Sequence, residues 1–477
     1  MISFLVSLVA LVVGYLIYGA LVEKWFGADP SRPTPAVTQT DGVDYVPLPW
    51  YKIFLIQFLN IAGLGPIFGA ILGALYGPSA FLWIVFGCIF GGAVHDYFSG
   101  MLSIRHEGKS IPEIVGLYLG DKTRQVMRLF SIILLLLVGT VFMVGPAGLL
   151  SNLGFEGIFA NKTFWLVVIL AYYFVATIVP VDKLIARIYP LFGAALLIMA
   201  IGIGGALVLG DWVIPEVGTP SAHPGGLPLW PMLFITIACG AISGFHATQS
   251  PLMARCVKNE AYGRPVFFGA MIAEGIVALV WAAAAMTFFP NGIPGLNEVL
   301  AKGGPGLVVN EVSVGLMGSF GGMLAVLGVI ACPVTSGDTA FRSVRLIFAD
   351  IFNLSQSKIR NRLLVAIPVF VSGYLLTLVD FTVIWRYFAF SNQALATIVL
   401  WTSAVYMVRN GRSHWFVSLP AAFMTAVCVT YIVMAPEGLA MSASVANPIG
   451  ILCALTIMIL FLLGRVFKQG NAKSVSH

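Results

Sequence analysis

Long apolar stretches recur along the whole chain, separated by mostly short polar linkers. Most are close to or above the roughly 20 residues that an α-helix needs to cross the hydrocarbon core of a bilayer. The pattern therefore predicts an all-α integral membrane protein with about thirteen transmembrane helices. These segments lie at residues 2–23, 50–77, 79–104, 126–150, 163–181, 185–209, 230–250, 265–289, 312–335, 361–379, 381–408, 414–434 and 444–466.

Composition removes the alternative of several soluble domains. Hydrophobic residues make up 59% of the chain, charged residues 10%, and the mean hydropathy is +0.95. The first segment lacks the basic start and the small-residue cleavage site of a signal peptide, so we expect it to remain as a helix. The longest linker, which follows it, is rich in Pro, Thr and Asp and predicts an irregular loop. The six cysteines are scattered without a CxxC pair, which disfavours a disulfide framework or a zinc cluster.

The distribution of basic residues tests this map. If the N-terminus lies outside, 22 of the 26 Lys and Arg residues fall on the inner side. Lys162 and Lys302 then lie outside, and Lys52 and Arg386 lie within segments. The positive-inside rule thus predicts an external N-terminus and a cytoplasmic C-terminus. It also accounts for the net charge of +6 without nucleic acid as a partner.

The second segment is interrupted in its middle. Its sequence "NIAGLGPIFG" places Asn60, Gly63, Gly65 and Pro66 within an apolar run. A break exposed to lipid leaves backbone groups unpaired, so such breaks persist where they line a polar cavity. The alternative is a proline kink with glycines that allow close helix packing.

A similar interruption occurs in the seventh segment, in "ITIACGAISGFHATQSP" at residues 235–251. The two interrupted segments are five apart, and an odd number of helices per repeat inverts the second copy. Paired broken helices of this kind indicate the substrate site of a secondary transporter. We therefore expect a first repeat at 50–210 and an inverted second repeat at 228–410. Residues 1–49 would form a peripheral helix with a cytoplasmic loop, and 411–477 two further helices and a tail.

The broken helices suggest what the substrate is. Half-helices that begin near Gly65 and Gly244 present unpaired amide groups and positive dipole ends, which attract an anion such as a carboxylate. The candidate substrate-binding residues are Asn60, Gly63, Gly65, Gly244, His246, Gln249, Arg386 and Asn392. For Arg386, an ion pair with Asp380 near the start of the same helix is the alternative to a substrate carboxylate.

Hydroxyl and carboxyl groups at the end of the ninth segment are candidates for ion coupling. The stretch "ACPVTSGDTAFRS" predicts that Thr335, Ser336, Asp338 and Thr339 lie on the inner half of the bundle. They would hold Na⁺ with hard oxygen ligands, or Asp338 would carry a proton. The alternative is a polar helix end with Arg342 at the headgroup boundary.

Three further ionisable residues lie at membrane depth, where charge is costly and usually functional. His95 and Asp96 are adjacent in the third segment, and Glu274 in the eighth has no basic residue nearby in sequence. We count all three among the ion-coupling candidates; packing or a bond to a neighbouring backbone is the alternative. His95, Asp96 and His246 are also weak candidates for a metal site, although their spacing does not demand one.

Several long motifs are similar to one known family. "GPIFGAILGALYGPSAFLWIVFGCIFGGAVHDYFSGMLSIRHEGKSIPEIV", "PVDKLIARIYP", "FHATQSP", "TSGDTAFRS" and "WRYFAFSNQALA" closely resemble the carbon starvation protein A (CstA) family over most of residues 50–410. The resemblance implies a bacterial inner-membrane secondary transporter for peptides, or in some members for pyruvate with protons. It also implies a relation to the amino acid–polyamine–organocation superfamily and its LeuT-like core of five plus five inverted helices. The chain is shorter than the long members, so we expect their C-terminal helices to be absent.

Together these features predict an importer for a peptide or small carboxylate, used in carbon starvation, that works by ion-coupled alternating access. The coupling ion is H⁺ or Na⁺, and we expect no other cofactor. A nutrient sensor built on a transporter scaffold, a channel and an intramembrane enzyme are alternatives. Phosphate-loop, GxSxG and HExxH patterns are absent from the sequence, so we expect no enzyme activity.

Overall fold

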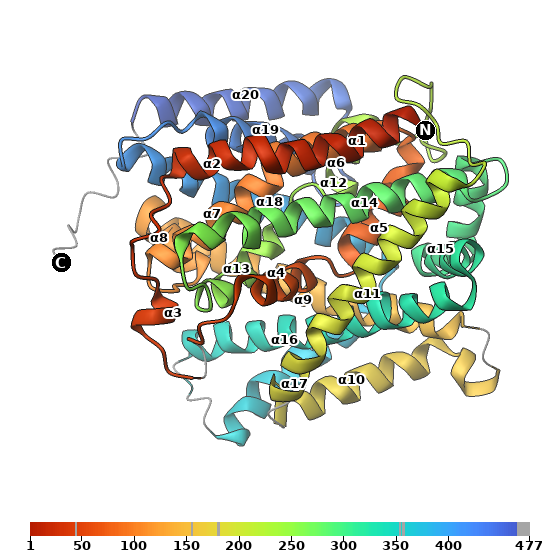
Figure 1. Ribbon diagram of the computed structural model, residues 1–477, viewed down its shortest axis with the longest axis horizontal. Coiled ribbons are helices and arrows are strands. Elements are labelled where there is room, and N and C mark those ends of the chain that lie inside the picture. Colours follow the sequence, from red (N-terminus) through yellow and green to blue (C-terminus); the bar gives the residue numbers. More distant parts are fainter. Residues whose placement is uncertain (43–44, 154–155, 179–181, 353, 355–357, 465–477) are drawn as a thin grey trace.

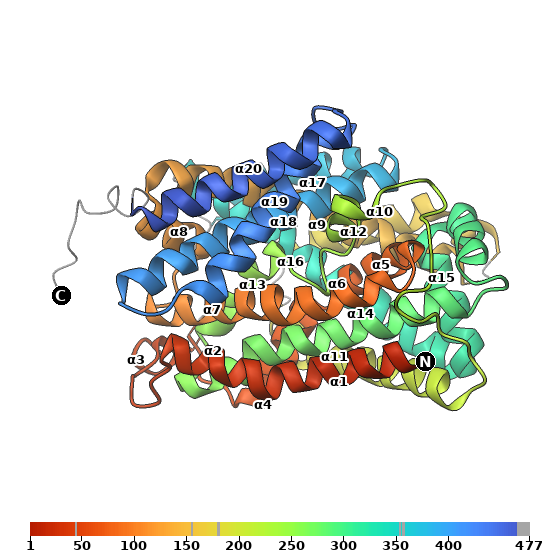
Figure 2. The ribbon, with the colours of Figure 1, turned by 90° about the horizontal axis from the view of Figure 1, so that it is seen from above.

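The computed structural model describes residues 1–464 except 43–44, 154–155, 179–181, 353 and 355–357. Within this part the chain is helical, with one isolated parallel bridge between Leu48 and Val257. Most of the long helices run along the longest axis of the molecule and lie side by side (Figures 1 and 2). The fold class predicted from the apolar pattern is confirmed.

The first half of the chain forms α1 to α11. Their bounds are α1 Ile2–Val13, α2 Gly19–Phe26, α3 Pro35–Thr38, α4 Trp50–Ile61, α5 Leu64–Gly73, α6 Ser79–Phe86, α7 Ala93–Arg105, α8 Ile111–Leu119, α9 Asp121–Ser151, α10 Lys162–Ile178 and α11 Asp182–Leu209. Two of these helices are short and lie in linkers. Of the two, α3 lies in the loop that was predicted to be irregular, and α8 begins with a capping box of Ser110 and Glu113.

The second half forms α12 to α20. Their bounds are α12 Leu229–Thr236, α13 Gly244–Ala254, α14 Gly269–Thr287, α15 Ile293–Leu324, α16 Cys332–Ile351, α17 Ile359–Leu376, α18 Phe381–Arg409, α19 Trp415–Met434 and α20 Ala443–Leu462. Short π-helical turns join some helices into one span, as at 14–18 between α1 and α2 and at 87–92 between α6 and α7.

Ten helices of the described residues are long and apolar enough to cross a membrane, or eleven if α4 and α5 count as one bent span. The predicted number of thirteen is therefore not confirmed. The difference lies in two places. The apolar helix at Lys162–Thr177 is shorter than a full span, and α12 and α13 are separate short helices.

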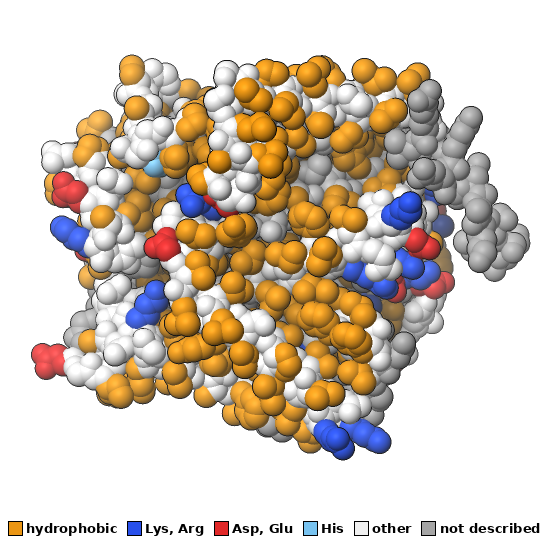
Figure 3. All heavy atoms as spheres, turned by 180° about the vertical axis from the view of Figure 1, so that it is seen from behind, with side chains coloured by type: hydrophobic (Ala, Val, Ile, Leu, Met, Phe, Trp, Pro, Cys, Tyr) orange, Lys and Arg blue, Asp and Glu red, His pale blue; other side chains and the backbone are white. Residues whose placement is uncertain are grey.

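The surface agrees with a membrane setting. Hydrophobic side chains cover most of the middle of the face seen in Figure 3, and charged side chains lie mainly toward the two ends of the long axis. The helices run along this same axis, so on this face the apolar surface covers their middle sections. That arrangement places apolar surface where lipid tails lie and charges near the headgroups.

The first predicted break is confirmed. Helix α4 ends at Ile61, α5 begins at Leu64, and the two axes differ by 49°. Pro66 lies in the first turn of α5, where its missing N–H costs no helical hydrogen bond. Gly63, which precedes α5, has a backbone conformation outside the helical region (φ −63°, ψ −135°).

The second predicted break is confirmed as well, and it is longer. Residues 237–243 separate α12 from α13, which begins at Gly244. Within this stretch Gly240 has φ +88°, a left-handed conformation that favours glycine. A Cβ there would also lie 2.6 Å from the Cβ of Ala278.

The predicted end of the ninth helix is wrong. The helix does not end near residue 335. A π-helical turn at 325–331 leads directly into α16, which continues to Ile351. The mean hydropathy falls along α16, but apolar residues at helical spacing, among them Phe341 and Val344, keep one face of this helix buried. The helical region also begins earlier than the predicted residue 312, because α15 starts at Ile293. This helix is bent at Gly304 and Gly318 (φ +67° and +62°). The candidate residues 335–339 therefore lie inside a helix, not at its end.

Some sequence predictions fall outside the described part of the structure. The basic tail residues Arg465, Lys468 and Lys473 belong to 465–477, and the side chains of Lys183 and Arg187 are likewise not described.

Candidate functional site

The two breaks lie against each other in the interior. A Cβ on Gly65 of α5 would lie 2.4 Å from the Cβ and 2.5 Å from the Sγ of Cys239, in the second break. A Cβ on Gly240 would lie 3.5 Å from the Cα of Pro66. Glycine at these positions thus permits the two interrupted segments to meet. Residues 57–71 and 237–247 are all buried, so neither break is open to the surface in this conformation.

Beside the breaks, two histidines share one carboxylate. The Nδ1 atom of His95 lies 2.8 Å from Oδ1 of Asp96, and the Nδ1 atom of His246 lies 2.9 Å from Oδ2 of the same residue. His95 and Asp96 come from α7 and His246 from α13, and all three side chains are fully buried. A buried carboxylate is stable only when its lone pairs are satisfied, and here both oxygens accept a bond.

Glu274 of α14 extends this network into the second break. Its Oε1 accepts a hydrogen bond from the N–H of Gly240 at 3.1 Å, and its Oε2 lies 3.4 Å from Nε2 of His246. The side chain is fully buried. Candidates from three separate stretches of the sequence, His95–Asp96, His246 and Glu274, therefore form one cluster. The charge of this cluster is linked directly to the backbone of the break.

The N-terminus of α13 is closed by a side chain. Oδ1 of Asn392, in α18, accepts hydrogen bonds from the N–H of Phe245 at 2.9 Å and from the hydroxyl of Ser243 at 2.8 Å. Its own Nδ2 donates to the carbonyl of Phe388. Asn392 was predicted to contact substrate, but the structure uses it as a cap for the broken helix. The predicted anion site at Gly244 is therefore already taken by an internal acceptor.

Two carbonyls on the other side of the same break also accept bonds from side chains. The indole N–H of Trp83 donates to the carbonyl of Ile237 at 2.9 Å, and the amide of Gln393 donates to the carbonyl of Phe234 at 2.9 Å. These bonds replace the helical bonds lost between α12 and α13, as a break at membrane depth requires.

The first break is different. Among the described residues, α5 has no side-chain cap at its N-terminus. On the other side of the break, the carbonyl of Leu59 in α4 accepts only a weak bond from the thiol of Cys332, at 3.6 Å. Asn60 is in the last turn of α4, and Gly63 and Gly65 stand at the start of α5. The amide groups that begin α5 are thus the ones not engaged by a side chain.

The remaining substrate candidates lie elsewhere. Gln249 is in α13, where its amide donates to the hydroxyl of Thr248. The guanidinium Nε of Arg386 lies 3.2 Å from Oε1 of Glu437, which also accepts from the hydroxyl of Tyr431. Asp380, the partner considered from the sequence, instead caps α18 by accepting from the N–H of Thr382. Arg386 is therefore engaged with the loop after α19 and not with the breaks.

The hydroxyl candidates of α16 form a second group. Thr335 and Thr339 donate to carbonyls of their own helix, Ser336 is buried, and Asp338 pairs with Arg342 at 2.9 Å. Because Cys332 contacts Leu59, this part of α16 lies beside the end of α4.

Sequence reasoning missed Cys239, Ser243 and Glu437. Cys239 and Ser243 lie in the non-helical stretch of the second break, where no regular spacing shows which side chains meet. Their adjacency to two glycines and to His246 was the signal available. The cysteine becomes part of the site because Gly65, at the start of α5, leaves room for it.

Comparison with known proteins places this geometry in context. The chain is 45% identical to an uncharacterized membrane protein of Haemophilus influenzae over 341 residues. This match covers 61% of the chain and 92% of the relative. The chain is 30% identical to the peptide transporter CstA of Campylobacter jejuni over 365 residues, covering 62% of the chain and 51% of the relative. It is also 30% identical to the pyruvate/proton symporter BtsT of Escherichia coli over 348 residues, which cover 58% of the chain and 48% of the symporter. The matched region is thus about half the length of these two named transporters.

The fold resembles that of a solved transporter. MHP1, a nucleobase-cation-symport-1 family transporter solved in a closed conformation with bromovinylhydantoin bound, superposes with a TM-score of 0.55 at 16% identity. The match covers 90% of this chain and 96% of MHP1. The family model described as carbon starvation protein CstA matches residues 1–152, 150–303 and 294–431. The chain therefore belongs to the carbon starvation protein CstA family.

Proposed function

We propose that this protein is a secondary transporter of the bacterial inner membrane that imports a small carboxylate or a peptide by proton-coupled alternating access. The observation that carries the proposal is the contact between two broken helices, α4/α5 and α12/α13, in the buried centre of the molecule. Relatives named as a peptide transporter and a pyruvate/proton symporter support the same function. We keep the external N-terminus and cytoplasmic C-terminus indicated by the basic residues.

The carboxylate of the substrate would bind at the N-terminus of α5. Amide groups there carry the positive end of the helix dipole, and no described side chain caps them. The N-terminus of α13 has Asn392 in the equivalent role. This asymmetry supports a substrate site at the first break, with Asn60, Gly63 and Gly65 as its nearest candidates. Pyruvate and a peptide both carry the required carboxylate.

Glu274 would carry the coupling proton. While ionised it accepts the N–H of Gly240, and a protonated carboxyl group is a weaker acceptor. Proton binding therefore loosens the second break, which contacts the first break through Cys239 and Gly65. His246 and Asp96 provide the path of polar groups leading to Glu274. The α16 hydroxyls are the alternative, as a Na⁺ site.

Uptake into proteoliposomes of the purified protein tests the proposal. Labelled pyruvate and a labelled dipeptide are compared under an inward proton gradient and, separately, an inward sodium gradient. We expect accumulation of one substrate under the proton gradient alone. Accumulation driven by sodium alone would overturn proton coupling and favour the α16 site. No uptake under either gradient would overturn transport and favour a transporter-like sensor.

A further inference from the structure

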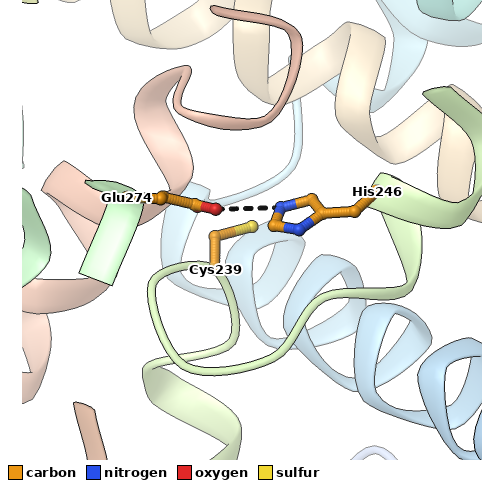
Figure 4. Close-up of side chains that lie close together, drawn as sticks. All are labelled: Cys239, His246 and Glu274. Carbon is orange, nitrogen blue, oxygen red and sulfur yellow. Dashed lines mark ion pairs between the residues drawn. The ribbon is translucent and has the colours of Figure 1, made fainter. Parts of the chain in front are cut away.

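Three potential metal ligands converge within the second break. Cys239, His246 and Glu274 point toward one another from the break, from α13 and from α14 (Figure 4). One donor atom from each residue lies within 4.8 Å of the other two. All three side chains are buried, and neither Nε2 of His246 nor Oε2 of Glu274 makes a hydrogen bond. Buried polar atoms left unbonded in this way require an explanation.

The surrounding groups orient these donors as a metal site requires. The carboxylate of Asp96 accepts from Nδ1 of His246, so a neutral imidazole would offer the lone pair of Nε2 to a metal on the side that faces Glu274. Metal-binding histidines commonly hold their other nitrogen against a carboxylate in this way. The N–H of Gly240 likewise donates a hydrogen bond to Oε1 of Glu274, so Oε2 is the oxygen that can coordinate a metal.

The spacing also fits. Nitrogen and oxygen ligands of tetrahedral zinc lie about 2.0–2.1 Å from the metal, so neighbouring ligand atoms are roughly 3.3–3.4 Å apart. The observed distance between Nε2 of His246 and Oε2 of Glu274 is 3.4 Å. This value is too long for a good hydrogen bond but matches one edge of a zinc tetrahedron.

We propose that Cys239, His246 and Glu274 bind a borderline transition-metal ion of the Zn²⁺ class. Thiolate and imidazole donors select such an ion over Na⁺, Mg²⁺ or Ca²⁺, which prefer oxygen ligands. Binding displaces the thiol proton of Cys239 to solvent. The thiolate and the carboxylate then neutralise the two charges of the metal, which suits a buried site. With three protein ligands, one coordination position remains for water or another small ligand.

The site is fully buried, so the ion enters when the breaks separate or while the chain folds. The test therefore loads the full-length protein in two ways. One is expression in medium supplemented with Zn²⁺ or Co²⁺, and the other is incubation of the purified, chelator-treated protein with either ion. Metal content per chain is measured after removal of free ion. In the cobalt-loaded protein, a thiolate-to-cobalt charge-transfer band reports directly on a cysteine ligand.

We expect one metal ion per wild-type chain and a charge-transfer band with Co²⁺. Cys239→Ala should lose the band and most of the bound metal. The control is Cys428→Ala, which removes a buried cysteine of α19 near Thr397 and should keep both. If Cys239→Ala does not fold, the band in wild-type protein still tests thiolate ligation, and Glu274→Gln tests the metal content.

A wild-type protein without bound metal after both loadings would overturn the site. So would equal metal content in wild type and a folded Cys239→Ala variant. These measurements use solubilised protein and no substrate, so their outcome is independent of whether the proposed transport is observed.

Discussion

The carboxylate of Glu274 accepts the amide N–H of Gly240 at 3.1 Å, across the interface between α14 and the second break. This bond links an ionisable side chain to a backbone conformation (φ +88°) that favours glycine. Gly240 in turn packs on Pro66 at the start of α5. We therefore expect a change in the charge of Glu274 to act on both broken helices.

Removing the cap of α13 should destabilise the protein. Asn392→Ala leaves the N–H of Phe245 and the hydroxyl of Ser243 without their shared acceptor. The expected cost is about 2 kcal/mol, from the lost cap and the buried donors. It is measured as a lower apparent melting temperature of the solubilised protein. Asn410→Ala, at the exposed C-terminal cap of the same helix, is the control. Equal melting temperatures for the two variants would contradict the capping role.

A methyl group at Gly65 should force the two breaks apart. The new Cβ of Gly65→Ala would lie 2.4 Å from the Cβ of Cys239, closer than packed atoms allow. Overpacking of this kind costs about 1–3 kcal/mol, and substrate uptake should fall with it. Gly205→Ala, whose Cβ meets open space on α11, should behave like wild type.

A second change tests the steric cause. Cys239→Gly combined with Gly65→Ala removes the clash and should recover part of the lost stability. If the double variant is less stable than Gly65→Ala alone, the contact between the breaks is not the cause.

Arg386 should contribute stability and not substrate recognition. Replacing Arg386 with alanine removes the cation that pairs with Glu437, whose side chain is only 7% exposed. We expect a cost of about 2 kcal/mol, since Arg386 is itself 35% exposed and water screens the pair. The double variant Arg386→Ala/Glu437→Gln should be more stable than Arg386→Ala alone. A large rise in KM with unchanged stability would instead place Arg386 at the substrate.

Zinc should inhibit uptake, because the metal and the coupling proton compete for Oε2 of Glu274. Inhibition is measured relative to each variant's own uptake without zinc. In Cys239→Ala the half-inhibitory zinc concentration should rise by at least about tenfold. Removing a group that merely supports a metal ligand already lowers metal affinity by about this factor. Cys428→Ala should retain the wild-type value. Equal inhibition of both variants would place the inhibitory zinc elsewhere.

Much of the architecture could be predicted from the sequence. Hydropathy gave the helical class and most spans, and the glycines and proline marked both breaks within a few residues. The ninth helix was misplaced because hydropathy falls at Asp338 and Arg342, although the helix continues with one buried face. The count of thirteen spans is not confirmed partly because α12 and α13, which the sequence suggested as one segment, are two short helices separated by a break.

Four residues of the buried cluster could be named from the sequence, but their arrangement could not, and Cys239 was missed. His95, Asp96 and Glu274 were recognised because charge at membrane depth is costly, and His246 because it lies in the interrupted seventh segment. Their contact depends on tertiary packing of α7, α13 and α14, which no local pattern encodes. The same limit applies to Asn392: its polarity was visible, but its role as a cap depends on where α18 meets the broken helix.

Proton movement that accompanies substrate is the most direct test of the central claim. Proteoliposomes that contain a pH-sensitive dye are mixed with pyruvate or a dipeptide at equal pH on both sides. We expect the transported substrate to acidify the interior of vesicles with wild-type protein. Glu274→Gln should give no acidification while still exchanging labelled for unlabelled substrate across the membrane. Substrate entry into wild-type vesicles without acidification would contradict proton coupling through Glu274.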